Sequence, residues 1–222
     1  MLNDTFDNPD EEHVKFCIQW GKQFPHSAHE GLIFVGRANN GWMCFNSSAE
    51  DIFNPNNENR AFSRDDQMIW VENNIDYSST SAFWRVIRKT SRHFFPNNEL
   101  MHIAWSNLYK IAPDGGNPNQ TLCNAQFNGC VKILKKELEI FSPRHVVFLT
   151  GIDWAKWFLY ELKGDKQISD VLCRTKKWGK SDEYEVNVYF FDGIYFYVTE
   201  HPQGKNESTH ISALIDSISQ NL

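Results

Sequence analysis

Residues 101–119 read MHIAWSNLYKIAPDGGNPN and pass from an apolar strand pattern into a rigid loop. Ile103 and Trp105 are apolar positions of the expected strand, and residues 113–118 hold two prolines and two glycines. In open α/β sheets, ligands bind outside the carboxyl ends of the strands, which is where Asn107 and Lys110 stand. An asparagine there can read a base or amide edge because it both donates and accepts. A lysine there can hold a phosphate. A polar strand end capped by water is the alternative for this stretch alone.

The rest of the chain predicts an α/β protein. We expect short buried strands over residues 32–35 and 145–149, and a hairpin over 186–198 that turns at Asp192-Gly193. Helices are expected over residues 11–24, 79–95 and 119–141, after Gly151, and near the C-terminus. Residues 164–181 are expected to form a basic connection. The alternation predicts a three-layer α/β/α sandwich with a mainly parallel central sheet. We expect one domain over residues 11–222, preceded by a frayed segment over 1–10.

Composition narrows the classes of function. A net charge of −6 argues against a broadly basic nucleic-acid coat, although a local basic face remains possible. There is no apolar N-terminal run and no long apolar stretch, so we expect neither a signal peptide nor a membrane span. The five cysteines are an odd number without a CxxC pair. They predict reduced thiols in a cytoplasmic protein, with no metal site and no cofactor.

Two further strand exits carry polar or glycine-rich residues. The strand over 32–35 leads into GRANNGW at 36–42, where two glycines suit a close backbone approach to a ligand. This loop has neither the dinucleotide-binding nor the P-loop spacing. The last strand runs into TEHPQG at 199–204. One of these segments alone would carry little weight.

The helix over 79–95 has a basic face formed by Arg85, Arg88, Lys89 and Arg92. Such a face could follow a phosphate backbone. A solvated basic face is the more common explanation.

Taken together, the three strand exits resemble those of the uracil-DNA glycosylase superfamily, most closely its bacterial and archaeal iron–sulfur type. Residues 106–113, SNLYKIAP, resemble a middle motif T-N-x-x-K-x-x-P-P, and Leu149-Thr150-Gly151 resembles a Leu-Gly before a helix. His201-Pro202 resembles the last motif of that family. The resemblance covers about residues 31 to 218. It implies the same sandwich fold and an enzyme that flips a base out of DNA and hydrolyses its N-glycosidic bond.

The resemblance also implies roles for individual residues. Asn107 would read the Watson–Crick edge of the base, and His201 would stabilise negative charge on its O2. The first loop, opening at Gly36, would line the sugar side and position water, with Asn39 or Asn40 as the candidates. The remaining candidates are Trp42 or Phe45 for stacking on the base, and Lys110, Arg37 and Gln203 for phosphate contacts.

The departures from the family pattern leave an alternative open. Active relatives carry an Asp, Asn or Glu in the first motif, whereas the early positions here are Arg37 and Ala38. Gln203 stands where a serine is usual. The four cluster cysteines are absent, so no iron–sulfur cluster is expected.

The resemblance implies that the partner is DNA or a nucleobase. It would be bound either by an enzyme or by an inactive base-, nucleotide- or DNA-binding protein. An α/β hydrolase is disfavoured because no G-x-S-x-G motif occurs.

Overall fold

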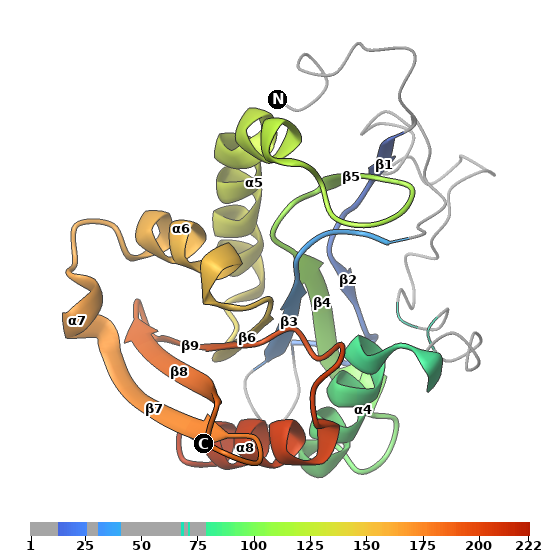
Figure 1. Ribbon diagram of the computed structural model, residues 1–222, viewed down its shortest axis with the longest axis vertical. Coiled ribbons are helices and arrows are strands. Elements are labelled where there is room, and N and C mark those ends of the chain that lie inside the picture. Colours follow the sequence, from blue (N-terminus) through green and yellow to red (C-terminus); the bar gives the residue numbers. More distant parts are fainter. Residues whose placement is uncertain (1–12, 26–30, 41–67, 69–70, 72–78) are drawn as a thin grey trace.

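A seven-stranded sheet forms the centre of the molecule. The computed structural model describes residues 13–25, 31–40, 68, 71 and 79–222. The strand order is β2-β4-β3-β6-β9-β8-β7. Their bounds are β2 Gln19–Trp20, β3 Leu32–Gly36, β4 Ile103–Asn107, β6 His145–Leu149, β7 Leu172–Trp178, β8 Tyr184–Phe191 and β9 Ile194–Thr199. The central strands β4, β3, β6 and β9 are parallel, and the outer strands β2, β8 and β7 pair antiparallel. The carboxyl ends of the four parallel strands therefore meet at one edge (Figure 1).

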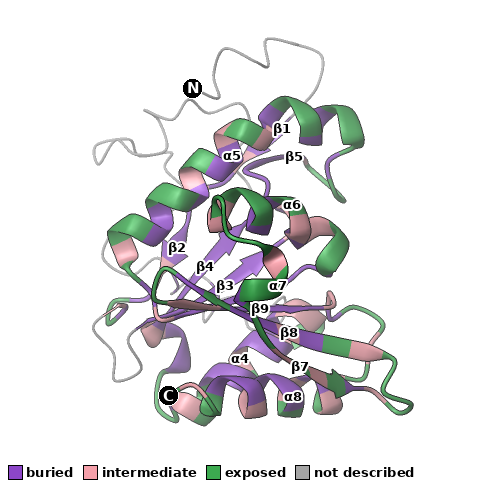
Figure 2. Cartoon of the chain, turned by 90° about the vertical axis from the view of Figure 1, so that its left-hand side faces the viewer, coloured by how far each residue is buried: buried purple, intermediate pink, exposed green. Residues whose placement is uncertain are grey.

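Helices cover both faces of this sheet. Helices α4 (Ala82–Phe94) and α8 (Glu207–Ser219) pack on one face, while α5 (Gln120–Phe141) and α6 (Ile152–Lys163) lie on the other (Figures 1 and 2). Every residue of β3, β4 and β6 is buried, as expected of strands covered on both sides. Phe34 belongs to the apolar cluster under α4 and α8, and Val35 belongs to the cluster under α5 and α6. The predicted three-layer sandwich is confirmed.

The shorter elements complete the fold. A 3-10 helix, η2 (Glu99–His102), precedes β4, and α7 (Ile168–Val171) precedes β7. Strands β1 (His13–Lys15) and β5 (Ile111–Pro113) pair antiparallel in a separate small sheet. This pairing ties the loop after Asn107 to the start of the described chain.

Local sequence explains where the main helices begin. The side chain of Asn119 accepts a hydrogen bond from the backbone N–H of Leu122 at 2.9 Å, and Asn206 accepts from Ser208 and Thr209 at the start of α8. Such N-caps satisfy amides that have no partner within the helix. The predicted hairpin is also confirmed. Asp192 and Gly193 have φ of 53° and 79°, as a type I′ turn requires.

Two sequence predictions were wrong. A helix was expected over residues 11–24, but the described residues 13–24 do not form one, since β1 and β2 lie within them. Phe16 and Ile18 are buried while Lys15 and Cys17 are half-buried, which is the alternation of an extended chain. Residues 164–181 are not a simple connection, because they contain α7 and β7. Lysines on β7 suit its position at the open edge of the sheet, where charge opposes pairing with other chains.

Some predictions fall outside the described residues. The segment expected to fray, 1–10, lies there, and so do Trp42 and Phe45. Within the described part of the chain, no helix is long and apolar enough to cross a membrane.

Candidate functional site

Four residues gather at the carboxyl edge of the sheet, on the face covered by α4. Gly36 ends β3 and pairs in register with Asn107, which ends β4. A Cβ on residue 36 would overlap Oδ1 of Asn107 and would lie 3.3 Å from the ring of Phe83 on α4. The Phe83 ring lies nearly parallel to that of His201, with centroids 6.2 Å apart and an interplanar angle of 15°. Phe83 therefore joins the β3–β4 strand ends to the segment after β9.

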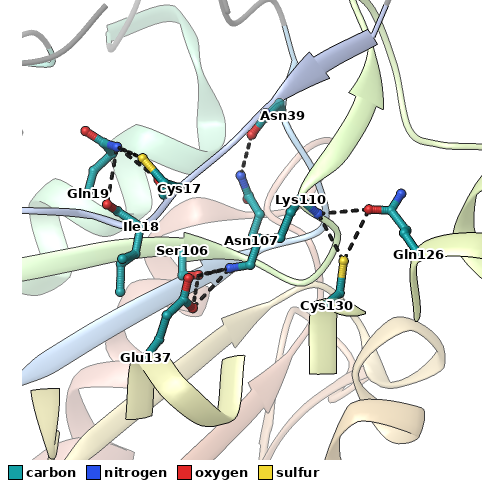
Figure 3. A network of polar contacts seen from close by, with 10 residues as sticks. All are labelled: Cys17, Ile18, Gln19, Asn39, Ser106, Asn107, Lys110, Gln126, Cys130 and Glu137. Atoms are coloured by element: carbon teal, nitrogen blue, oxygen red, sulfur yellow. Dashed lines mark hydrogen bonds and ion pairs between the residues drawn. The ribbon is translucent and has the colours of Figure 1, made fainter. Parts of the chain in front are cut away.

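Asn107 is held by the first loop. Its Nδ2 donates to Oδ1 of Asn39 at 2.8 Å (Figure 3). The two residues are 1% and 2% exposed, so this hydrogen bond is buried. Nδ2 of Asn39 is also buried and has no hydrogen-bond partner in the structure as described. Two of the predicted site residues thus meet, and they leave an unsatisfied donor beside them.

The electrostatics of His201 favour a neutral imidazole. Burial, followed by the positive charges of Arg37 and Lys205, lowers the pKa of His201 to about 4. Its Nδ1 accepts a hydrogen bond from the backbone N–H of Gln203 at 3.3 Å. The proton of the neutral ring therefore lies on Nε2, which can act as a donor. The Gln203 side chain is exposed, and its backbone holds the tautomer of His201.

Lys110 does not occupy the position that the sequence suggested. It is 1% exposed, and its Nζ donates to Glu137 Oε1 at 2.7 Å and to Ser106 Oγ at 2.7 Å (Figure 3). Ser106 Oγ in turn donates to Glu137 at 2.7 Å. Side chains alternate along a strand, so Ser106 faces α5 while Asn107 faces α4. Because its ammonium group is used inside the protein, we do not retain Lys110 as a phosphate contact.

A buried glutamine fixes the backbone next to this ion pair. Oε1 of Gln126 on α5 accepts from the backbone N–H groups of Lys110 and Ile111, at 3.1 and 2.9 Å. Its Nε2 donates to the carbonyl of Ile111 at 2.7 Å. The segment that follows Asn107 is therefore anchored to α5 by both side chain and backbone.

The other predicted first-loop residues, Arg37 and Asn40, form hydrogen bonds to groups other than Asn107. Arg37 is half-buried, its Nε donates to the carbonyl of Thr150 at 2.7 Å, and its guanidinium lies 5.2 Å from the ring centroid of Trp154. Burial lowers the pKa of Arg37, and the charge of Glu200 opposes this effect. Asn40 is exposed, and its Oδ1 accepts from the backbone N–H of Gly116 at 3.1 Å. Asn40 thus bridges to the loop after β5, and only Asn39 meets Asn107.

Three of the four cations on the basic face of α4 pair with two carboxylates. Arg85 donates through Nε to Glu207 at 3.0 Å, while Arg88 and Arg92 contact Glu99 at 3.2 and 2.7 Å. These pairs join α4 to α8 and to η2. They favour a structural role for the three arginines.

Sequence reasoning did not assign Phe83 to the site. Glu137 and Gln126 were likewise not singled out. The alternation of β4 could have shown that Ser106 and Asn107 face opposite layers, but helix periodicity does not reveal which strand end a residue meets.

Among the residues the structure describes, no three His, Cys, Asp or Glu side chains form a group that could hold a metal ion.

The model of a family described as the uracil DNA glycosylase superfamily matches residues 10–218. No curated protein matches the chain. The matched residues include all three strand exits.

Proposed function

The chain belongs to the uracil DNA glycosylase superfamily, and from this premise we propose that it binds a nucleobase flipped out of DNA and hydrolyses its N-glycosidic bond. The observation that carries the proposal is His201, which is neutral and protonated on Nε2. Its ring stacks on Phe83, and Phe83 and Asn107 both border Gly36. A neutral donor suits a group that must stabilise a developing anion without giving up its proton.

The chemistry assigns one step to each group. Asn107 accepts from the ring N–H of the base and donates to the adjacent carbonyl. The bond between C1′ and the base nitrogen breaks, and its electron pair moves onto the base, with charge on O2. His201 Nε2–H donates to that oxygen. Water adds to C1′, and its proton is released as the leaving base is protonated at the nitrogen.

A second candidate, base binding without hydrolysis, is favoured by one observation. Oδ1 of Asn39, the acceptor that could orient water, is already bonded to Asn107. There is also no carboxylate between Gly36 and Asn40. A site of this kind could recognise a base without activating water.

A glycosylase assay distinguishes the two candidates. Labelled oligonucleotides carry a single uracil, hypoxanthine or xanthine, and wild type is compared with His201→Ala and Asn107→Ala. Cleavage by the wild type that His201→Ala abolishes would support the enzyme. Binding that Asn107→Ala abolishes, without any cleavage by the wild type, would support the second candidate. A wild type that neither binds nor cleaves these strands would contradict both.

A further inference from the structure

The hydrogen bond between Asn39 and Asn107 determines which way the Asn107 amide faces. A carboxamide has a donor end and an acceptor end, and rotation by half a turn exchanges them. Here Nδ2 is directed toward Asn39, at 2.8 Å, because Asn39 presents an oxygen (Figure 3). Oδ1 of Asn107 consequently lies over Gly36, on the face that carries Phe83.

The groups left available define a hydrogen-bonding pattern. In the described part of the chain, Oδ1 of Asn107 accepts no hydrogen bond, and its Nδ2 has a second N–H beyond the one given to Asn39. Nδ2 of Asn39 is a buried donor without a partner. The amide pair therefore offers an acceptor beside donors.

This pattern matches one class of base edge. Uracil and hypoxanthine present a ring N–H beside a carbonyl, which is a lactam edge. Cytosine and adenine present a bare ring nitrogen beside an amino group, which is the reverse pattern. If the Asn107 amide rotated, the same residue would match cytosine or adenine.

We propose that Asn39 is a specificity-determining residue whose Oδ1 locks the Asn107 amide so that the site accepts lactam-edged bases and rejects cytosine and adenine. This inference rests on the proposed function, since it concerns the same site. It assigns Asn39 to base selection, in contrast to the water-positioning role that the family resemblance suggested. The unpartnered Nδ2 of Asn39 then serves as a further donor toward the carbonyl of the base.

The two roles of Asn39 predict different results for the same variants. If Asn39 positions water, Asn39→Ala lowers cleavage of every base by the same factor and leaves relative binding unchanged. If Asn39 locks Asn107, Asn39→Ala frees the amide to rotate, and the preference for a lactam edge falls. Asn39→Asp retains an oxygen toward Asn107 and should preserve the preference.

Equilibrium binding tests the proposal without requiring catalysis. The full chain is titrated against labelled single strands that are identical except for one position, which holds uracil or cytosine. The ratio of the two affinities is the readout. We expect roughly a tenfold or greater fall of this ratio in Asn39→Ala, the scale of one two-point base contact, and a ratio near wild type in Asn39→Asp.

A matched control separates this effect from loss of a buried amide in general. Gln19 is also a buried amide with an unpartnered atom, and it lies on β2 at the edge of the sheet. Gln19→Ala should lower stability without changing the ratio. An unchanged ratio in a folded Asn39→Ala protein would overturn the proposal for Asn39 alone. If the wild type bound neither strand, the proposed function would fail, and this inference with it.

Discussion

Gly36 and Asn107 are register partners across the β3–β4 pair, and the absent side chain of Gly36 leaves the space that the Asn107 amide fills. Residue 36 is glycine because the side chain of Asn107 approaches it closely. Its backbone does not require glycine, since the φ of Gly36 is not in the left-handed region. The same space is bordered by the ring of Phe83. A single methyl group at residue 36 would therefore reach two of the candidate base-binding groups.

We accordingly expect Gly36→Ala to displace the Asn107 amide and to weaken base binding by roughly tenfold or more. Overpacking at this buried position should also cost about 1–3 kcal/mol of unfolding free energy. Affinity for a uracil-containing strand and denaturant unfolding measure the two effects. Gly115→Ala is the control, because a Cβ on residue 115 would meet nothing within 4 Å. Equal loss of affinity in both variants would show that Gly36 has no special role.

Phe83 is expected to contribute an aromatic face to the bound base. Phe83→Leu keeps an apolar side chain of moderate size but removes stacking, which is worth about 1–3 kcal/mol per base. Base affinity should therefore fall by roughly tenfold, measured by titration with a labelled strand. Phe94→Leu is the matched control, since Phe94 is half-buried on the same helix. A similar loss in both variants would assign the effect to the helix rather than to stacking.

The lowered pKa of His201 predicts an unusual pH profile. Because the pKa is about 4, the imidazole remains neutral as the pH falls from 7 to 5, and it takes up a proton only near pH 4. Protonation at Nδ1 would also break the hydrogen bond from Gln203. Base cleavage, or base binding if there is no cleavage, should stay level down to pH 5 and fall below it. A decline centred on the ordinary histidine value of 6.5 would contradict this environment for His201.

Much of the fold could be predicted because its signals are local. Continuous apolar runs identified β3 and β6, and Asp192-Gly193 identified the hairpin. Residues 11–24 were misassigned because Val14, Cys17, Ile18 and Gly21 also satisfy a helical spacing. The pairing that makes the segment extended is with β4 and β5, far along the chain.

The candidate site was predictable only in part. Strand ends could be located from the sequence, and the structure places Asn107 at the end of β4 and His201 shortly after β9, as expected from their positions. The partners of the side chains could not be predicted, because the carboxylate that pairs with Lys110 lies 27 residues away on α5. The exposed fraction of a side chain could not be predicted either. A lysine beside a loop suggests a phosphate contact, whereas this one is 1% exposed.

The arginines of α4 should prove structural. Arg92 is largely exposed and paired with Glu99, so Arg92→Ala should cost no more than about 1 kcal/mol of unfolding free energy. If this face does not contact DNA, the slope of log affinity against log salt should stay at the wild-type value. Titrations at several salt concentrations measure that slope. A shallower slope in the variant would place Arg92 at the DNA backbone.

The ion pair between Lys110 and Glu137 should show the cost of an isolated buried charge. Removing one partner leaves the other charged or unpaired in the core, and this typically costs about 3–5 kcal/mol. Lys110→Met should therefore lower the unfolding free energy by that order, measured with denaturant. The double variant Lys110→Met/Glu137→Leu removes both charges and should recover much of the loss, although Ser106 then loses its acceptor. Losses that simply add in the double variant would show that the two side chains do not stabilise each other. Where the double variant folds, base affinity near wild type would show that Lys110 contributes nothing to phosphate binding.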